Sequence, residues 1–127
     1  MINRMYNNLY HALNLVVPAH PKVQEIKVKP SNNLIESNSN FSIICNIFGD
    51  SSTEIEFLFR QRRSNETILI GKVWSNIEEN FIWTSILLIK LSRNSSGDYF
   101  CRDLNDHRNI ANISIDINCM NISNANY

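Results

Sequence analysis

The chain has 127 residues, enough for one domain with a single hydrophobic core and too few for two such domains. Its 12 Lys and Arg residues balance its 12 Asp and Glu residues and are scattered, so no basic stripe indicates nucleic-acid binding. The three glycines are isolated, which excludes a glycine-rich phosphate loop.

The residues that stand out in the composition are Ile and Asn. Ile, together with Phe, Val and Tyr, favours strands, whereas Asn favours turns. The two together predict an all-β chain with many short connections. A genome-wide bias in base composition explains the excess itself equally well.

Residues 1–21 are predicted to form an N-terminal arm outside the domain. Arg4 precedes an apolar stretch at 9–17, which resembles a secretory signal peptide, but His11 and Asn14 interrupt that stretch. Three interpretations stay open: a weak signal peptide, a start inside a longer protein, and a disordered arm. No stretch of the sequence is long enough to span a membrane.

From residue 22 onward, short runs of alternating apolar and polar residues between turn residues predict a series of strands. The first covers 23–28 and ends at Pro30, with a short second piece at Leu34 and Ile35. Further strands are predicted at 41–47, 55–59, 67–73, 83–91, 98–101 and 111–117. The intervening turns and loops are predicted at 49–52, 60–65, 78–80 and 103–108.

Alternation within these strands separates the residues that face the core from those that face solvent. The inward residues are Phe41, Ile43, Cys45, Ile47, Ile55, Phe57, Phe59, Ala111, Ile113, Ile115 and Ile117. The outward residues include Ser42, Ile44, Asn46, Phe48, Glu56, Leu58, Arg60, Asn112, Ser114 and Asp116.

The stretch 86–101 carries the most specific pattern in the chain. It contains an apolar strand, a polar corner that ends in glycine, and a second strand with a tyrosine two residues before a cysteine. The residues of this pattern are Ile86, Leu88, Leu91, Gly97, Tyr99 and Cys101. Over residues 22–117 the spacing resembles that of an immunoglobulin superfamily domain.

This resemblance implies an all-β, immunoglobulin-like sandwich of two antiparallel sheets. It implies that the Tyr99 hydroxyl turns back onto the backbone just upstream of it. It also implies a disulfide between Cys45 and Cys101, which stabilises the fold by about 3 to 4 kcal/mol in the chain-entropy model. Strand 55–59 lacks the Trp that such domains pack on this disulfide, and Phe57 is the best-placed substitute, with Phe59 second.

Two further departures refine the resemblance. Ser95 stands where most members carry Asp, so the salt bridge made by that Asp is not expected here. The last strand lacks the Gly-x-Gly bulge of antigen-receptor variable domains. The chain is therefore more similar to the intermediate or C2-like sets, which occur in adhesion molecules and receptors.

Five asparagines fit the acceptor pattern for N-linked glycosylation, although some arise by chance in so Asn-rich a chain. Together with the disulfide they indicate the secretory pathway and an extracellular or cell-surface location. The acceptors are Asn40, Asn65, Asn94, Asn112 and Asn121.

Cys119 lies in the predicted C-terminal tail, residues 118–127, and has no partner after Cys45 and Cys101 pair. It would form a covalent dimer, pair with a cysteine elsewhere in a longer chain, or remain a free thiol. No two cysteines have the spacing of a metal site, so neither a metal nor a cofactor is expected.

No catalytic constellation is present, and we do not expect an enzyme. His11, His20 and His107 fall in the predicted arm, a linker and a loop. None of them has a Ser, Cys or acid at the spacing of a catalytic motif.

Surface recognition is the remaining hypothesis. The sheet made by strands 55–59, 98–101 and 111–117 would present two apolar side chains flanked by arginines, with Glu56 nearby, and aromatic residues and Arg are enriched at interface centres. Its residues would be Leu58, Arg60, Phe100 and Arg102. Isolated exposed apolar residues, which are common, are the alternative interpretation.

Two other surfaces compete with this face. Ile44 and Phe48 would form a patch on the opposite sheet, where a glycan on the nearby Asn40 would block it. The charged loop at 103–108 is the other, because loops at the ends of a sandwich often bind ligands.

The resemblance implies a binding module for cell adhesion or receptor signalling. Its partner would be a protein, and a second copy of this chain is one candidate. Fold alone does not determine function. A first alternative is a structural spacer in a longer surface protein. A second is a secreted decoy or immune modulator released by a parasite or virus.

Overall fold

The computed structural model describes residues 20–30 and 40–117, which form eight strands and one 3-10 segment. The predicted strand piece at Leu34 and Ile35, the unpaired Cys119 and the glycosylation acceptor Asn121 therefore lie outside the described residues. The strands are β1 (Lys22–Lys29), β2 (Phe41–Phe48), β3 (Glu54–Gln61), β4 (Ile68–Trp74), β5 (Ile77–Glu79), β6 (Ile82–Ile89), β7 (Gly97–Asp103) and β8 (Asp106–Ile115), and the 3-10 segment η2 covers Arg93–Ser95.

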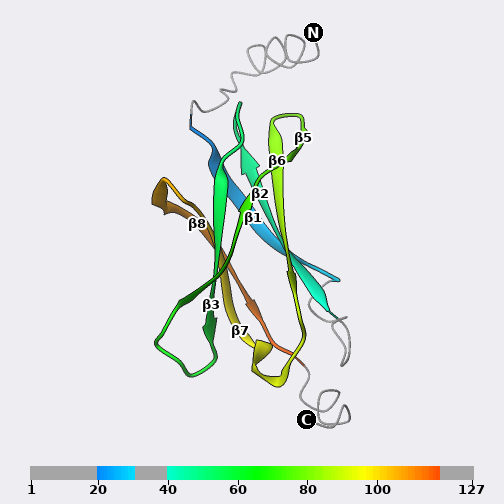
Figure 1. Cartoon of the computed structure of the whole chain (residues 1–127), viewed down its shortest axis with the longest axis vertical. Coiled ribbons are helices and arrows are strands. Elements are labelled where there is room, and N and C mark those ends of the chain that lie inside the picture. The colour runs from blue at the N-terminus through cyan, green and yellow to red at the C-terminus, as the bar shows by residue number, and fades with distance from the viewer. Residues whose placement is uncertain (1–19, 31–39, 118–127) are drawn as a thin grey trace.

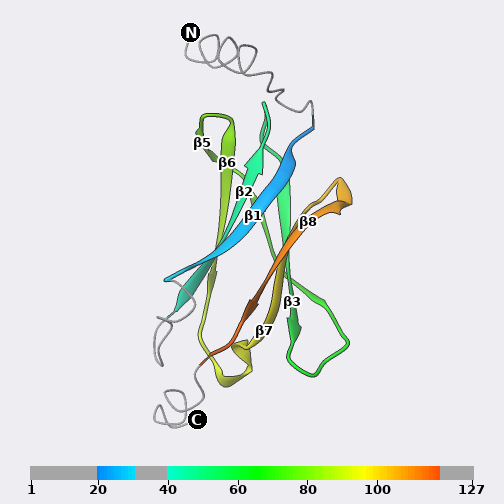
Figure 2. The same ribbon diagram turned by 180° about the vertical axis from the view of Figure 1, so that it is seen from behind.

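The strands form two four-stranded antiparallel sheets, in the orders β1-β2-β6-β5 and β4-β3-β7-β8. The predicted two-sheet sandwich is thereby confirmed. Figures 1 and 2 show the strands running along the long axis of the molecule. The described part begins at one end of this axis and finishes, after β8, at the other end (Figure 1).

The core lies between the sheets and consists of the residues that alternation turns inward. Phe41, Ile43, Cys45 and Ile47 on β2 are all buried, while the residues between them are half-buried. This pattern follows from the period of two in a strand, because one face of β2 must be apolar to pack against the other sheet.

A disulfide joins the two sheets at their centres. Cys45 on β2 and Cys101 on β7 are bonded and completely buried, as the resemblance implied. Phe57 on β3 is the cross-strand partner of Cys101 and is also buried, so it fills the core beside the disulfide. The Tyr99 ring packs between Phe41 and Phe59, with ring centroids 5.9 Å and 4.6 Å away.

Two predicted connections are shorter than expected. The predicted turn at 78–80 is mostly strand, because residues 77–79 pair with β6, and the turn moves to Asn80 and Phe81, whose φ angles are 56° and 67°. The predicted loop at 103–108 is a two-residue turn, Leu104 and Asn105, between β7 and β8. In both places the charged residues that suggested a loop belong to paired strands.

Candidate binding surface

The outward side of the β4-β3-β7-β8 sheet carries an apolar row between two charged rows. Cross-strand partners lie on the same face of a sheet, so register alone defines the rows. The apolar row runs Leu69, Leu58, Phe100 and then Asn112. One charged row contains Lys72, Glu56 and Arg102, and the other contains Arg60, Asp98 and Ser114. These residues, Asn112 excepted, are called the contact face below.

Within the apolar row, the expectation that Leu58 lies exposed is wrong. Leu58 is only 7% exposed, because its strand lies inside the sheet and its cross-strand partners Leu69 and Phe100 flank it on both sides. Leu69 is 49% exposed and Phe100 is half-buried. A partner would therefore meet Leu69 and Phe100, with Leu58 supporting them from below.

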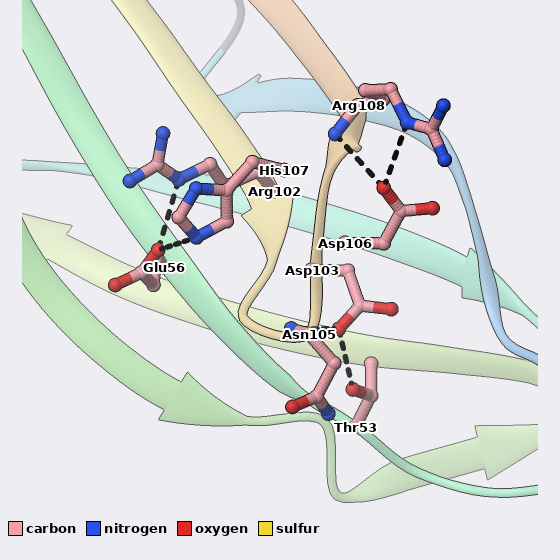
Figure 3. Close-up of polar contacts among 8 residues, drawn as sticks. All are labelled: Thr53, Glu56, Arg102, Asp103, Asn105, Asp106, His107 and Arg108. Atoms are coloured by element: carbon pink, nitrogen blue, oxygen red, sulfur yellow. Dashed lines mark hydrogen bonds and ion pairs between the residues drawn. The ribbon is translucent and has the colours of Figure 1, made fainter.

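Glu56, expected to point into solvent, is also buried, and it holds two basic side chains. Its Oε1 atom lies 2.9 Å from Arg102 Nε and 3.2 Å from His107 Nε2 (Figure 3). His107 belongs to β8 rather than to a loop. The guanidinium of Arg102 is thus positioned by a carboxylate from the neighbouring strand, which reduces the cost of ordering it on binding.

Arg60 is positioned in a similar way on the other side of the apolar row. Its Nη2 atom lies 2.9 Å from Asp98 Oδ2, and its guanidinium carbon lies 5.5 Å from the centre of the Phe100 ring. The Ser114 hydroxyl donates to the other oxygen of Asp98. These two contacts, the hydroxyl first, lower the pKa of the Asp98 carboxyl below its ordinary value.

Four further apolar residues are exposed on the outward surfaces, and none of them was predicted to be a surface residue, although Ile86 and Leu88 were named as residues of the family pattern. Trp74, 58% exposed, is the partner of Glu54 on the contact-face side, and Ile110 is the partner of Arg102. On the opposite sheet, Ile86 is the partner of Ile44, and Leu88 is 65% exposed. The alternation of β6 could have identified the last two, whereas Trp74 and Ile110 required the strand pairing.

The competing patch around Ile44 and Phe48 is half-buried rather than open. Ile44 lies between Lys27 on β1 and Ile86 on β6. Its more exposed neighbours, Ile86 and Leu88, make the outward side of β6 the most exposed apolar part of this sheet.

The turn between β7 and β8 borders an open polar pocket of about 590 Å³, the third candidate surface. Asp103 is buried there and accepts hydrogen bonds from the Thr53 hydroxyl, 3.0 Å away, and from the Asn105 backbone, 2.9 Å away (Figure 3). This carboxylate therefore braces the turn. Within the described residues no group of three or more His, Cys, Asp or Glu side chains could hold a metal ion, and no helix could span a membrane.

The four acceptor asparagines in the described part of the chain are all exposed. Asn40 accepts a hydrogen bond from the Leu91 backbone, and Asn94 accepts one from the Gln61 side chain. Asn65 lies in the β3–β4 connection. This connection, the β6–β7 connection with η2 and the start of β2 lie at the end of the sandwich where β8 finishes (Figure 1). Asn112 differs, because it lies within β8, directly opposite Phe100.

Comparison with protein-family models and with curated proteins found no match to this chain. The surfaces above are therefore interpreted from their geometry and chemistry.

Proposed function

We propose that this chain is an extracellular immunoglobulin-like binding module that recognises a protein partner through the contact face. The observation that carries the proposal is the apolar row of Leu69, Leu58 and Phe100 between two rows of ordered charged residues. An apolar centre with a polar, hydrogen-bonded rim is the usual composition of a protein interface.

The strand order supports membership of the immunoglobulin superfamily. Constant-type domains have strands A, B, E and D in one sheet and C, F and G in the other, with a disulfide between B and F. Here β1-β2-β6-β5 corresponds to the first sheet, and β3-β7-β8 corresponds to the second, with β4 added beside β3. The disulfide between β2 and β7 and the inward Tyr99 two residues before Cys101 agree with this assignment.

An extracellular location is supported by two features of the described residues. Disulfides persist in oxidising compartments, and the Cys45–Cys101 bond lies in the centre of the core. The acceptor asparagines Asn40, Asn65, Asn94 and Asn112 are exposed, as glycan attachment requires.

The experiment uses the secreted protein coupled to fluorescent beads, which are mixed with one another and with cells of the source organism. Phe100→Asp and Leu69→Lys should each abolish bead clustering or cell binding, because each places a charge in the apolar row. Leu58→Asp is a poor test, since this side chain is buried and a charge there would destabilise the fold.

The matched control is Leu88→Asp, which introduces the same charge at a more exposed position on the opposite sheet. It should leave binding unchanged. If the control abolishes binding and Phe100→Asp does not, the partner binds the β1-β2-β6-β5 sheet instead, and the contact face is refuted.

A spacer role is the second candidate, and one observation favours it. The described chain begins at one end of the long axis and finishes at the other, which is the arrangement needed to string domains end to end (Figure 1). Unchanged binding in every surface variant, with the fold intact, would support the spacer.

A further inference from the structure

We propose that a glycan on Asn112 and a protein partner compete for the contact face, so that occupancy of this one acceptor regulates binding. This inference rests on the proposed function, since it concerns the same surface.

The register places the acceptor in the apolar row itself. Asn112 on β8 is the cross-strand partner of Phe100 on β7, which in turn is the partner of Leu58 on β3. Directly opposite residues on one face of an antiparallel pair have Cβ atoms about 4.5 to 5.5 Å apart. A glycan is much larger than this separation, so one attached to Asn112 would extend over or beside the Phe100 ring.

The side chain of Asn112 is accessible for glycan attachment. It is exposed, and β8 is an edge strand of its sheet. The opposite face of β8 is inward, as the buried Ile115 shows. The glycan is therefore directed to the same side as Leu69 and Phe100.

The other three described acceptors lack this relationship. Asn40 precedes β2, Asn65 lies in the β3–β4 connection and Asn94 belongs to η2, so none of them has a residue of the contact face as a cross-strand partner. Glycans at these positions would cover one end of the sandwich. Among the four, only Asn112 links glycosylation to the proposed surface.

The third residue of the acceptor motif determines how the test must be made. The Ser114 hydroxyl donates to Asp98, which also binds Arg60. Ser114→Ala would remove the acceptor and disturb a charged row of the contact face at once. Asn112→Gln removes the acceptor alone.

The experiment compares wild-type protein, Asn112→Gln and Asn65→Gln, all secreted from cells that attach N-linked glycans. Glycopeptide mass spectrometry measures occupancy of Asn112, and the bead assay measures binding to beads of the same variant and to cells. We expect most wild-type chains to carry the glycan, and Asn112→Gln to raise binding by about tenfold or more, the scale of losing access to a central interface residue. Asn65→Gln should match the wild type.

Four outcomes would overturn the inference. They are an unoccupied Asn112, equal binding by Asn112→Gln and Asn65→Gln, weaker binding by Asn112→Gln, and no binding by any variant. Asn112→Ser, measured in parallel, replaces Asn112→Gln if the latter is not secreted. Adding Phe100→Asp to the Asn112→Gln protein separates the two proposals. If the double variant still binds, the contact face itself is wrong. If the double variant loses binding and Asn112→Gln alone has no effect, only the regulation by the glycan is wrong.

Discussion

The hydroxyl of Tyr99 on β7 donates a hydrogen bond to the backbone carbonyl of Ser95, four residues upstream at the end of η2. Ser95 in turn accepts from the backbone of Ser92 through its own side chain, so the whole corner between β6 and β7 is closed by short polar contacts. Because the Tyr99 ring lies in the core between Phe41 and Phe59, this corner is tied directly to the packing of both sheets.

Tyr99→Phe should lower the free energy of unfolding by about 1 to 3 kcal/mol, since it keeps the ring but leaves a buried carbonyl without its donor. Urea denaturation of the wild type and variant checks this, and an unchanged denaturant slope would show that the folded and unfolded states are otherwise similar. A loss near zero would mean that water replaces the hydroxyl.

Alkaline pH should destabilise the wild type more than Tyr99→Phe. Burial raises the pKa of the Tyr99 hydroxyl above its ordinary value near 10, so the folded state holds a proton that the unfolded state releases. The contribution of this group is complete below about pH 10 and falls as the pH rises further. Unfolding midpoints in urea at pH 9, 10 and 11 should diverge between the two proteins, and parallel curves would contradict this.

Gly97→Ala should destabilise the fold more than Gly71→Ala. A Cβ atom at residue 97 would collide with the backbone carbonyl of Arg60, which cannot move without breaking the β3–β7 pairing. At residue 71 the Cβ atom would lie 2.9 Å from the end of the flexible Leu87 side chain. Overpacking typically costs about 1 to 3 kcal/mol, and we expect Gly97→Ala at or above the top of this range. Thermal unfolding of both variants gives the order, and the reverse order would contradict it.

Asp98→Asn should flatten the acid limb of the stability curve. The Ser114 hydroxyl and Arg60 lower the pKa of Asp98, so its contribution is present above the ordinary Asp pKa of about 4 and is lost as the pH falls through the lowered value. The difference in unfolding free energy between wild type and Asp98→Asn should therefore shrink from pH 5 to pH 2. Ser114→Ala removes the main cause of the lowered Asp98 pKa, so the difference in unfolding free energy between wild type and Ser114→Ala should also shrink from pH 5 to pH 2. A pH-independent difference would refute the assignment.

Local patterns predicted the parts of the fold that depend on one strand at a time. The inward set of β2 and the orientation of Tyr99 and Cys101 follow from alternation, which needs no knowledge of neighbouring strands. The short strand β5 could not be found in this way, because it exists only through its pairing with β6 and the turn at Asn80 and Phe81.

The candidate site was predicted less completely for the same reason. Phe100, Arg60 and Arg102 were found from their outward parity, but the burial of Leu58 depends on the strands on both sides of β3. The proximity of Asn112 to Phe100 is a matter of register between β7 and β8. The turn at Leu104 and Asn105 pairs Asp103 with Asp106, and a register shift between Arg102 and Asp103 then pairs Arg102 with Ile110, an irregularity that the sequence does not reveal.

The position of the disulfide limits how the domain responds to mechanical tension. Cys45 and Cys101 are 56 residues apart in sequence, and the described chain begins and finishes at opposite ends of the long axis. A force applied to these ends can stretch only the segments outside the bridge, so β3, β4, β5 and β6 are shielded from the load. In single-molecule pulling, a reducing agent should lengthen the unfolded chain by roughly 190 Å, the extended length of the bridged segment. With the disulfide intact, the two sheets could separate under load while the segment between Cys45 and Cys101 stays unextended. The domain would thus act as a short, stiff tether.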